Sequence, residues 1–140
     1  MRRLTIAVLT ALGALVISMP SASAGSPHFI QSSLSASVSG STLTVSGKEA
    51  GLGDEAQVNV VLTATAECIN GGGRHPKATN KSSVTAGGDF PVQNGKANFT
   101  LTATAAFQPS CTPPMTVVFV DVVLMDTTNG ITANIPGTLG

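Results

Sequence analysis

The 140-residue sequence contains no tryptophan and no tyrosine, and only 10% of its residues are charged, with seven Lys and Arg against seven Asp and Glu. A nucleic-acid-binding protein normally carries a basic excess and aromatic side chains for base stacking, so the composition argues against that class. A disordered chain would be poor in hydrophobic residues, whereas 42% of these residues are hydrophobic. The length and composition therefore indicate one ordinary globular domain.

The first 24 residues are typical of a secretory signal peptide. Arg2 and Arg3 give a positively charged start, residues 4–19 form an almost unbroken apolar run, and Ala22-Ser23-Ala24 matches the small-x-small cleavage pattern. This run is shorter than the roughly 20 residues that cross a bilayer. We therefore predict a cleaved signal peptide at 1–24 and a single secreted, extracellular domain at 25–140, with no membrane as a partner after cleavage.

Cleavage at this point leaves five basic and seven acidic side chains, so the mature domain has a net charge of about −2. This mildly acidic balance argues against anionic partners, including nucleic acid. The two histidines, His28 and His75, are not accompanied by a Gly-x-Ser-x-Gly motif, so the sequence supplies no serine-hydrolase signature. We assign no catalytic residue and no cofactor, and we predict that the protein is not an enzyme.

Only two cysteines are present, Cys68 and Cys111. A lone pair in an exported protein is most simply one disulfide, because the compartment is oxidising and the wide spacing lacks the C-x-x-C pattern of zinc sites. The bridge would close a loop of 42 residues, for which the chain-entropy model gives a stabilisation on the order of 4 kcal/mol. A disulfide of this size is comparable to the whole stability of a small domain.

Hydrophobic residues recur with period two along the mature chain, and turn residues interrupt them at regular intervals, which indicates an all-β domain. Cys68 falls on the inward face of a long strand that begins near Val58. Two Asn-Gly pairs, at 94–95 and 129–130, are typical of tight hairpin turns. The predicted strands are 28–38, 42–49, 57–68, 81–87, 96–106, 115–126 and 130–135. About seven antiparallel strands with one disulfide predict an immunoglobulin- or fibronectin-like sandwich, without the core tryptophan of true immunoglobulin domains.

Residues 117–125 are apolar on both faces of their predicted strand, with Asp121 as the one interruption. This pattern is expected of a central strand covered on both sides, or of a strand whose outer face makes a contact. On the second interpretation, Val118, Val120 and Val122 point outward and form an interaction surface.

Alternating strand directions place the loops at two ends of the sandwich. The 69–80 and 107–114 loops meet at one end, as the disulfide requires, and bring basic residues with them. The 50–56 loop and the two Asn-Gly turns meet at the other end, where carboxylates gather. Four of these, Asp54, Glu55, Asp89 and Asp126, are conceivable calcium ligands because hard cations take several oxygens. The sequence lacks a dense Asp-x-Asp loop, however, so we expect no metal.

The most distinctive segment of the sequence is the glycine-rich stretch that follows Cys68. Three consecutive glycines free the backbone for unusual conformations or for close approach of a partner, and polar side chains flank them. A long hairpin loop held by the disulfide and a recognition loop are both consistent with this composition. The candidate recognition residues are Asn70, Gly71, Gly72, Gly73, Arg74, His75, Lys77 and Asn80. Asn80 and Asn98 also begin N-glycosylation sequons.

Two resemblances follow from these residues. The Cys-x-Asn-x-Gly-Gly pattern at 68–73, before Pro76 and Asn80-Lys81, resembles that of small secreted proteins of filamentous bacteria, whose role is uncharacterised. Separately, the segments 43–47 and 83–86 and the last hairpin are similar to those of the neocarzinostatin family of secreted seven-stranded chromophore carriers. That resemblance implies a small hydrophobic ligand in a cleft beside the sandwich, although this chain has one cysteine pair where the family has two.

The sequence therefore predicts a small, secreted, non-enzymatic interaction or binding module. Its expected partner is an extracellular protein, a cell-wall component or a small apolar ligand. Two alternatives remain open, namely a carrier of a small apolar molecule and a secreted hydrolase inhibitor. A carrier requires an apolar cleft open to solvent, whereas an inhibitor requires a rigid exposed loop, for which 69–81 is the candidate.

Overall fold

The computed structural model describes residues 25–70 and 80–140, so the predicted signal peptide lies outside the described part of the chain. Within these ranges no helix is long and apolar enough to cross a membrane. The elements, in chain order, are β1 (His28–Phe29), the 3-10 helix η1 (Gln31–Ser33), β2 (Ser35–Ser39), β3 (Thr42–Ala50), β4 (Gln57–Ile69), β5 (Lys81–Pro91), β6 (Ala97–Thr104), β7 (Thr116–Asp126) and β8 (Ile131–Ile135).

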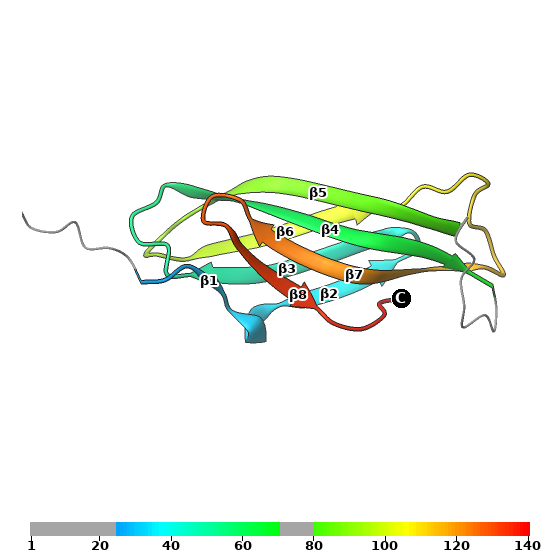
Figure 1. The fold of residues 1–140 in the computed structure, drawn as a ribbon, viewed down its shortest axis with the longest axis horizontal. Coiled ribbons are helices and arrows are strands. Elements are labelled where there is room, and N and C mark those ends of the chain that lie inside the picture. Colours follow the sequence, from blue (N-terminus) through cyan, green and yellow to red (C-terminus); the bar gives the residue numbers. More distant parts are fainter. Residues whose placement is uncertain (1–24, 71–79) are drawn as a thin grey trace, which may run out of the picture.

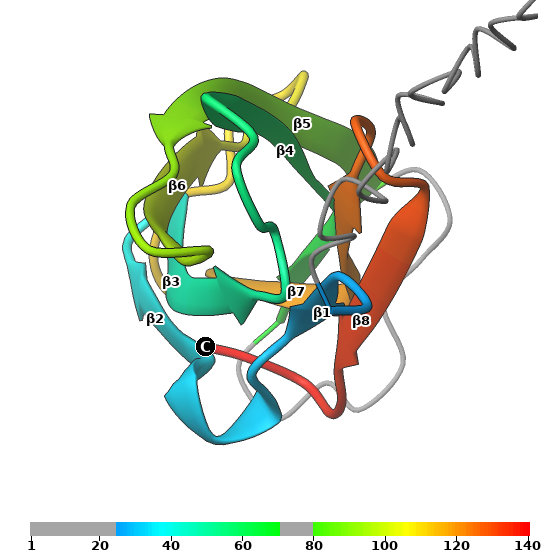
Figure 2. The same ribbon diagram turned by 90° about the vertical axis from the view of Figure 1, so that its left-hand side faces the viewer.

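The strands form two antiparallel sheets, which confirms the predicted all-β sandwich. In the first sheet β3 pairs with β1 and β2 and also with β6, and in the second the order is β5-β4-β7-β8. The long strands run side by side along the molecule (Figure 1), and the view turned by 90° shows the two sheets enclosing the interior (Figure 2). Hydrophobic side chains from both sheets meet in this interior and form one core.

The core follows the period-two pattern of the sequence. The predicted inward residues of β4 are all buried, namely Val58, Val60, Leu62, Ala64, Ala66 and Cys68. The β6 side chains alternate between buried and exposed along the whole strand. Gly47 occupies an inward position of β3 because a Cβ atom there would lie 2.5 Å from a methyl carbon of Leu34 and 2.8 Å from the Phe99 ring. The close approach of these two side chains therefore requires glycine.

Two predicted strands differ from the structure by more than two residues, and the limits of the others differ by one or two residues. The segment predicted as one strand at 28–38 is interrupted by η1, where the Ser33 N–H donates to the Ile30 carbonyl oxygen at 2.9 Å. Strand β5 runs to Pro91, four residues beyond the predicted end, because Gly87 and Gly88 continue the pairing with β4 and do not turn. A Cβ atom at Gly88 would lie 3.2 Å from the Phe90 ring, so glycine leaves room for that ring.

A β-bulge in β7 explains why residues 117–125 are apolar at both odd- and even-numbered positions. The register between β4 and β7 shifts between Thr63 and Thr65, and Asp121 takes a positive φ of 51°. The inward positions are therefore odd-numbered before the bulge and even-numbered after it. Phe119, Val122 and Leu124 are all buried as a result.

The proposed outward face is wrong for Val118 and Val122, and only Val120 remains partly exposed. Val122 is 1% exposed because the bulge turns its side chain into the core. Val118 is at an outward position before the bulge, but it is only 7% exposed. Around Phe119, the chain near Leu139 pairs with β7 through two backbone hydrogen bonds, so β7 has neighbours on both sides there. This surface does not offer the continuous valine patch that the sequence predicted.

The two Asn-Gly pairs form different turns. Asn94 and Gly95 both have positive φ, 52° and 74°, and close a two-residue hairpin between β5 and β6, as predicted. In the turn between β7 and β8 only Gly130 has a positive φ, 71°. That turn spans four residues, 127–130, and the Gly130 N–H donates to the Asp126 carbonyl oxygen at 2.8 Å. The prediction of the same tight turn at both places is therefore wrong for the second.

Candidate functional site

The disulfide end of the sandwich contains the predicted bridge. Cys68, at the end of β4, is bonded to Cys111, and their Cα atoms are 5.8 Å apart. Of the candidate recognition loop, only Asn70 and Asn80 belong to the described part of the chain. The other members lie outside the described residues, namely Gly71, Gly72, Gly73, Arg74, His75 and Lys77. On β5, Lys81 forms an ion pair with Glu67, with 3.3 Å between Nζ and Oε1.

An apolar cleft lies beside this disulfide and has a volume of about 330 Å³. Its walls come from the turn between β2 and β3, from the segment that follows Cys111, and from the end of the chain. The lining side chains include Val38, Cys111, Pro113, Met115 and Val117. The volume is near the lower limit for small-molecule sites, so the cleft could hold a small apolar ligand.

The opposite end gathers the carboxylates, as the alternating strand directions predicted. Glu49 at the end of β3 and Asp126 at the end of β7 are both completely buried. The Asn129 amide nitrogen donates to Glu55 Oε2 at 3.1 Å and to Asp126 Oδ2 at 2.7 Å, and Asp126 Oδ1 also accepts from the Thr128 and Asn129 N–H groups. Asp126 therefore holds the turn that follows β7 and positions the Asn129 side chain between Asp126 and Glu55.

The buried pair of Glu49 and Asp126 must hold a proton. Among the described residues no group donates a hydrogen bond to either carboxyl oxygen of Glu49, and ionised carboxylates only accept. Burial raises the pKa of Glu49 to about 9, and the hydrogen bond to Asp126 and the negative charges of Asp126 and Glu55 act in the same direction. Burial also opposes the ionised form of Asp126, but hydrogen bonds from Glu49, Asn129 and Thr128 outweigh it and lower the pKa of Asp126. Burial beside the Asp126 carboxylate therefore favours the neutral form of Glu49 at neutral pH.

The four candidate metal ligands do not assemble into a metal site. Asp126 is engaged in the turn just described, and Asp89 accepts a hydrogen bond from Asn59 Nδ2 at 2.8 Å on the sheet surface. Asp54 is exposed on the loop between β3 and β4. In residues 25–70 and 80–140, no three His, Cys, Asp or Glu side chains are placed to hold a metal ion.

The outer surface of the first sheet is lined by hydroxyl groups. Three successive outward positions on each of three neighbouring strands are serine or threonine: Ser35, Ser37 and Ser39 on β2, Thr42, Thr44 and Ser46 on β3, and Thr100, Thr102 and Thr104 on β6. The register aligns them in three rows across the strands. In each row the β3 and β6 hydroxyl oxygens lie 3.1 to 3.3 Å apart, within hydrogen-bond distance. We call these nine residues the hydroxyl face.

Comparison of the chain with protein-family models, with curated proteins and with solved structures finds no match. The functional conclusion therefore rests on the residues of this chain and on their geometry. The hydroxyl face continues toward the end of the sheet that carries the Asn94-Gly95 turn.

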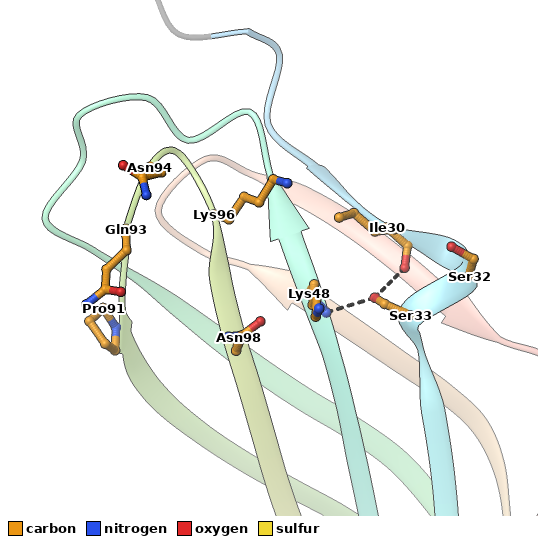
Figure 3. Close-up of a pocket in the computed structure, with 9 residues that line it drawn as sticks. All are labelled: Ile30, Ser32, Ser33, Lys48, Pro91, Gln93, Asn94, Lys96 and Asn98. Carbon is orange, nitrogen blue, oxygen red and sulfur yellow. Dashed lines mark hydrogen bonds between the residues drawn. The ribbon is translucent and has the colours of Figure 1, made fainter.

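An open groove of about 770 Å³ continues the hydroxyl face toward this turn. Figure 3 shows it between the β5–β6 hairpin and the chain around η1, with β3 and β6 in between. Lys48 and Asn98, which are paired in register, extend the outward side of β3 and β6 into it. The remaining lining residues are Ile30, Ser32, Ser33, Pro91, Gln93, Asn94 and Lys96. We call this hollow the lysine groove.

Ser33 ties one wall of the lysine groove to β3. Its hydroxyl donates to the Ile30 carbonyl oxygen at 2.6 Å and accepts from the Lys48 N–H at 2.9 Å (Figure 3). Asn98, which begins one of the two sequons, is exposed here on the outward side of β6. The sequence analysis singled out neither Lys48 nor Lys96. The available signal was the strict alternation of Ser and Thr in 35–39, 42–46 and 100–104, which Lys48 and Asn98 extend.

Proposed function

We propose that the protein is a secreted, non-enzymatic binding module that attaches through its hydroxyl face to a neutral, hydroxyl-rich polymer outside the cell, such as a cell-wall polysaccharide. The observation that carries this proposal is the unbroken set of nine Ser and Thr side chains on three adjacent strands. A sheet surface that serves only solubility normally mixes lysine and glutamate with its other polar residues. These three rows contain no charged residue.

The chemistry of these side chains suits a hydroxylated partner. Each serine or threonine hydroxyl both donates and accepts hydrogen bonds, as do the hydroxyls of a sugar or polyol. Threonine is β-branched, so its χ1 angle is restricted and little side-chain freedom is lost on contact. A neutral polymer also avoids the cost of stripping water from charges. Within each row, neighbouring strands lie about 4.7 to 4.9 Å apart, which gives a regular surface.

The expected partner is an extended surface and not a short oligosaccharide. The sequence has no tryptophan or tyrosine, and Phe29, Phe99 and Phe119 are buried in the core, so none of these rings can stack on a sugar. Exposed hydroxyl contacts are individually weak because they replace hydrogen bonds to water. Useful affinity then requires many contacts at once, which an insoluble or repetitive polymer provides.

A charge placed on the hydroxyl face is expected to abolish attachment. Thr102→Glu introduces a carboxylate in the middle row of the proposed contact, where it would lose water on binding. We expect at least roughly a tenfold loss of binding to insoluble cellulose and chitin, measured as protein removed from solution. Thr85→Glu is the matched control. Thr85 is an exposed threonine opposite Thr63 in the second sheet, just as Thr102 is opposite Thr44 in the first.

Thr85→Glu should bind as the unchanged protein does. Equal loss in both variants would indicate general repulsion and contradict a contact on the hydroxyl face. If the unchanged protein binds neither polymer nor purified bacterial cell-wall sacculi, the proposed function is wrong.

A second candidate function is the carriage of a small apolar molecule, which the apolar cleft beside the disulfide favours. The expected result is that an environment-sensitive apolar dye such as anilinonaphthalene sulfonate gains fluorescence with the mature protein. Val38→Glu, which places a carboxylate on the cleft wall, should remove that gain because a buried unpaired charge opposes apolar binding. An unchanged signal in this variant, or no signal in the unchanged protein, would count against a carrier.

A further inference from the structure

The lysine groove carries positive charge, unlike the uncharged hydroxyl face beside it. Lys48 and Lys96 both line it, and no carboxylate does. In the part of the chain that the structure describes there is one further lysine, Lys81, and it is paired with Glu67 at the other end of the sandwich. Two lysines without an ion-pair partner among the described residues therefore share a single groove.

The acidic residue nearest in sequence does not cancel this charge. Glu49 follows Lys48 directly, but its side chain is buried on the opposite side of β3. Its pKa is raised to about 9, mainly by burial, so it is uncharged at neutral pH. The groove therefore keeps its positive charge although the mature domain as a whole is mildly acidic. Because salt screens charges beyond about 8 to 10 Å, this local arrangement outweighs the net charge for a bound group.

Polar neutral side chains complete the donor set of the groove. Asn94, Gln93 and Asn98 contribute amide groups that donate hydrogen bonds. Asn94 is held in a left-handed conformation by the two-residue hairpin, which fixes its position at the rim. Ammonium and amide donors together suit an anionic oxygen ligand. Lysine binds phosphate as a point charge, whereas the planar, two-pronged recognition of carboxylates favours arginine, and no arginine lines the groove.

We propose that the lysine groove binds a phosphate group carried by the same polymer that lies on the hydroxyl face, so that the ligand is a phosphate-bearing polysaccharide or polyol chain. This inference rests on the proposed function and narrows its ligand class. The continuity of the two surfaces supports it: Thr44, Ser46 and Lys48 are successive outward residues of β3, and Thr102, Thr100 and Asn98 are their partners on β6. A chain that follows these strands reaches the lysines directly.

The test compares the mature protein on three insoluble supports: cellulose, phosphorylated cellulose and carboxymethyl cellulose of equal charge density. We expect stronger retention on phosphorylated cellulose than on either of the others, with the difference declining as salt increases. Lys48→Gln and Lys96→Gln should each reduce this preference by up to about fivefold, the range of exposed ion pairs. Neither variant should change retention on cellulose.

Lys81→Gln is the matched control, because it removes the same charge from the other end of the molecule. It should leave the preference for phosphorylated cellulose unchanged, and a loss equal to that of Lys48→Gln would overturn the groove as the site. Equal retention of the unchanged protein on all three supports overturns this inference and leaves the proposed function standing. Equal retention on the phosphorylated and carboxymethyl supports overturns the choice of phosphate. Binding to phosphorylated cellulose that Thr102→Glu does not weaken overturns the hydroxyl-face function instead.

Discussion

Removal of the disulfide by the double substitution Cys68→Ala and Cys111→Ala is expected to lower the free energy of unfolding by about 4 kcal/mol. The two residues are separated by 43 positions in the sequence, so the intact bond excludes many extended conformations of the unfolded chain. Alanine is the appropriate replacement because Cys68 is buried, and a serine hydroxyl there would need a hydrogen-bond partner. A domain of ordinary stability would lose a large part of its free energy of unfolding.

Urea unfolding followed by far-ultraviolet circular dichroism would measure this effect. The unchanged protein treated with a reductant is the control, and it should unfold at a similarly reduced urea concentration. A loss below about 1 kcal/mol would contradict the prediction, because the loop-closure model gives several times that value for a loop of this length. A variant that does not fold at all agrees with it if the oxidised protein unfolds cooperatively under the same conditions.

The buried pair of Glu49 and Asp126 is expected to make the domain less stable as the pH rises. The pKa of Glu49 is about 9 in the folded protein, against an ordinary value of 4.5, so the folded state retains a proton that the unfolded state releases between these values. Stability from this residue is therefore complete below about pH 4.5 and decreases as the pH rises toward 9. We expect a decrease of up to about 4 kcal/mol between pH 5 and pH 8, because the two states differ by nearly one bound proton over these three pH units.

Asp126 acts in the opposite direction in strong acid. Its pKa is lowered in the folded protein, chiefly by hydrogen bonds that outweigh burial, so its contribution is lost when the pH falls below its usual value of 3.8. The two residues together predict maximal stability near pH 4 to 5. Melting temperatures recorded from pH 3 to pH 9 would show this maximum.

Glu49→Gln should remove most of the decrease in the free energy of unfolding that accompanies rising pH. The glutamine amide has nearly the size and shape of the neutral acid, can donate hydrogen bonds at every pH, and carries no proton that can be lost. We expect the variant to be nearly equal to the unchanged protein in stability at pH 4.5 and more stable at pH 8 by up to about 4 kcal/mol. Glu67→Gln is the matched control, because Glu67 is paired with Lys81 and should gain no stability at pH 8. A parallel pH dependence in the protein with and without Glu49→Gln would show that another group titrates.

Much of the fold could be predicted because local sequence patterns encode it. The inward residues of β4 and β6 follow from strict alternation, since successive side chains of a strand point to opposite faces. The Asn94-Gly95 hairpin follows from the positive φ that both positions require. In β7 the same logic fails, because the bulge at Asp121 depends on pairing with β4 and moves Val122 into the core.

The candidate site was less predictable than the fold. Asp126 was identified as a conceivable metal ligand, but its burial with Glu49 depends on contacts between segments that are far apart in the sequence. Lys48 and Lys96 are isolated charges in the sequence, and only the pairing of β3 with β6 brings them into one groove. The hydroxyl face was visible as three alternating segments, although the sequence did not establish that these segments are neighbours.

The sequence by itself determined which side chains of the regular strands enter the core and which two cysteines form the bridge, because period-two alternation is local and two cysteines permit only one pairing. Only the tertiary structure decided the register of the sheets, the bulge, the neutral state of Glu49 and the union of the hydroxyl face with the lysine groove. These features arise from contacts between distant segments, where burial and neighbouring charges change the properties of a residue. No local pattern contains that information.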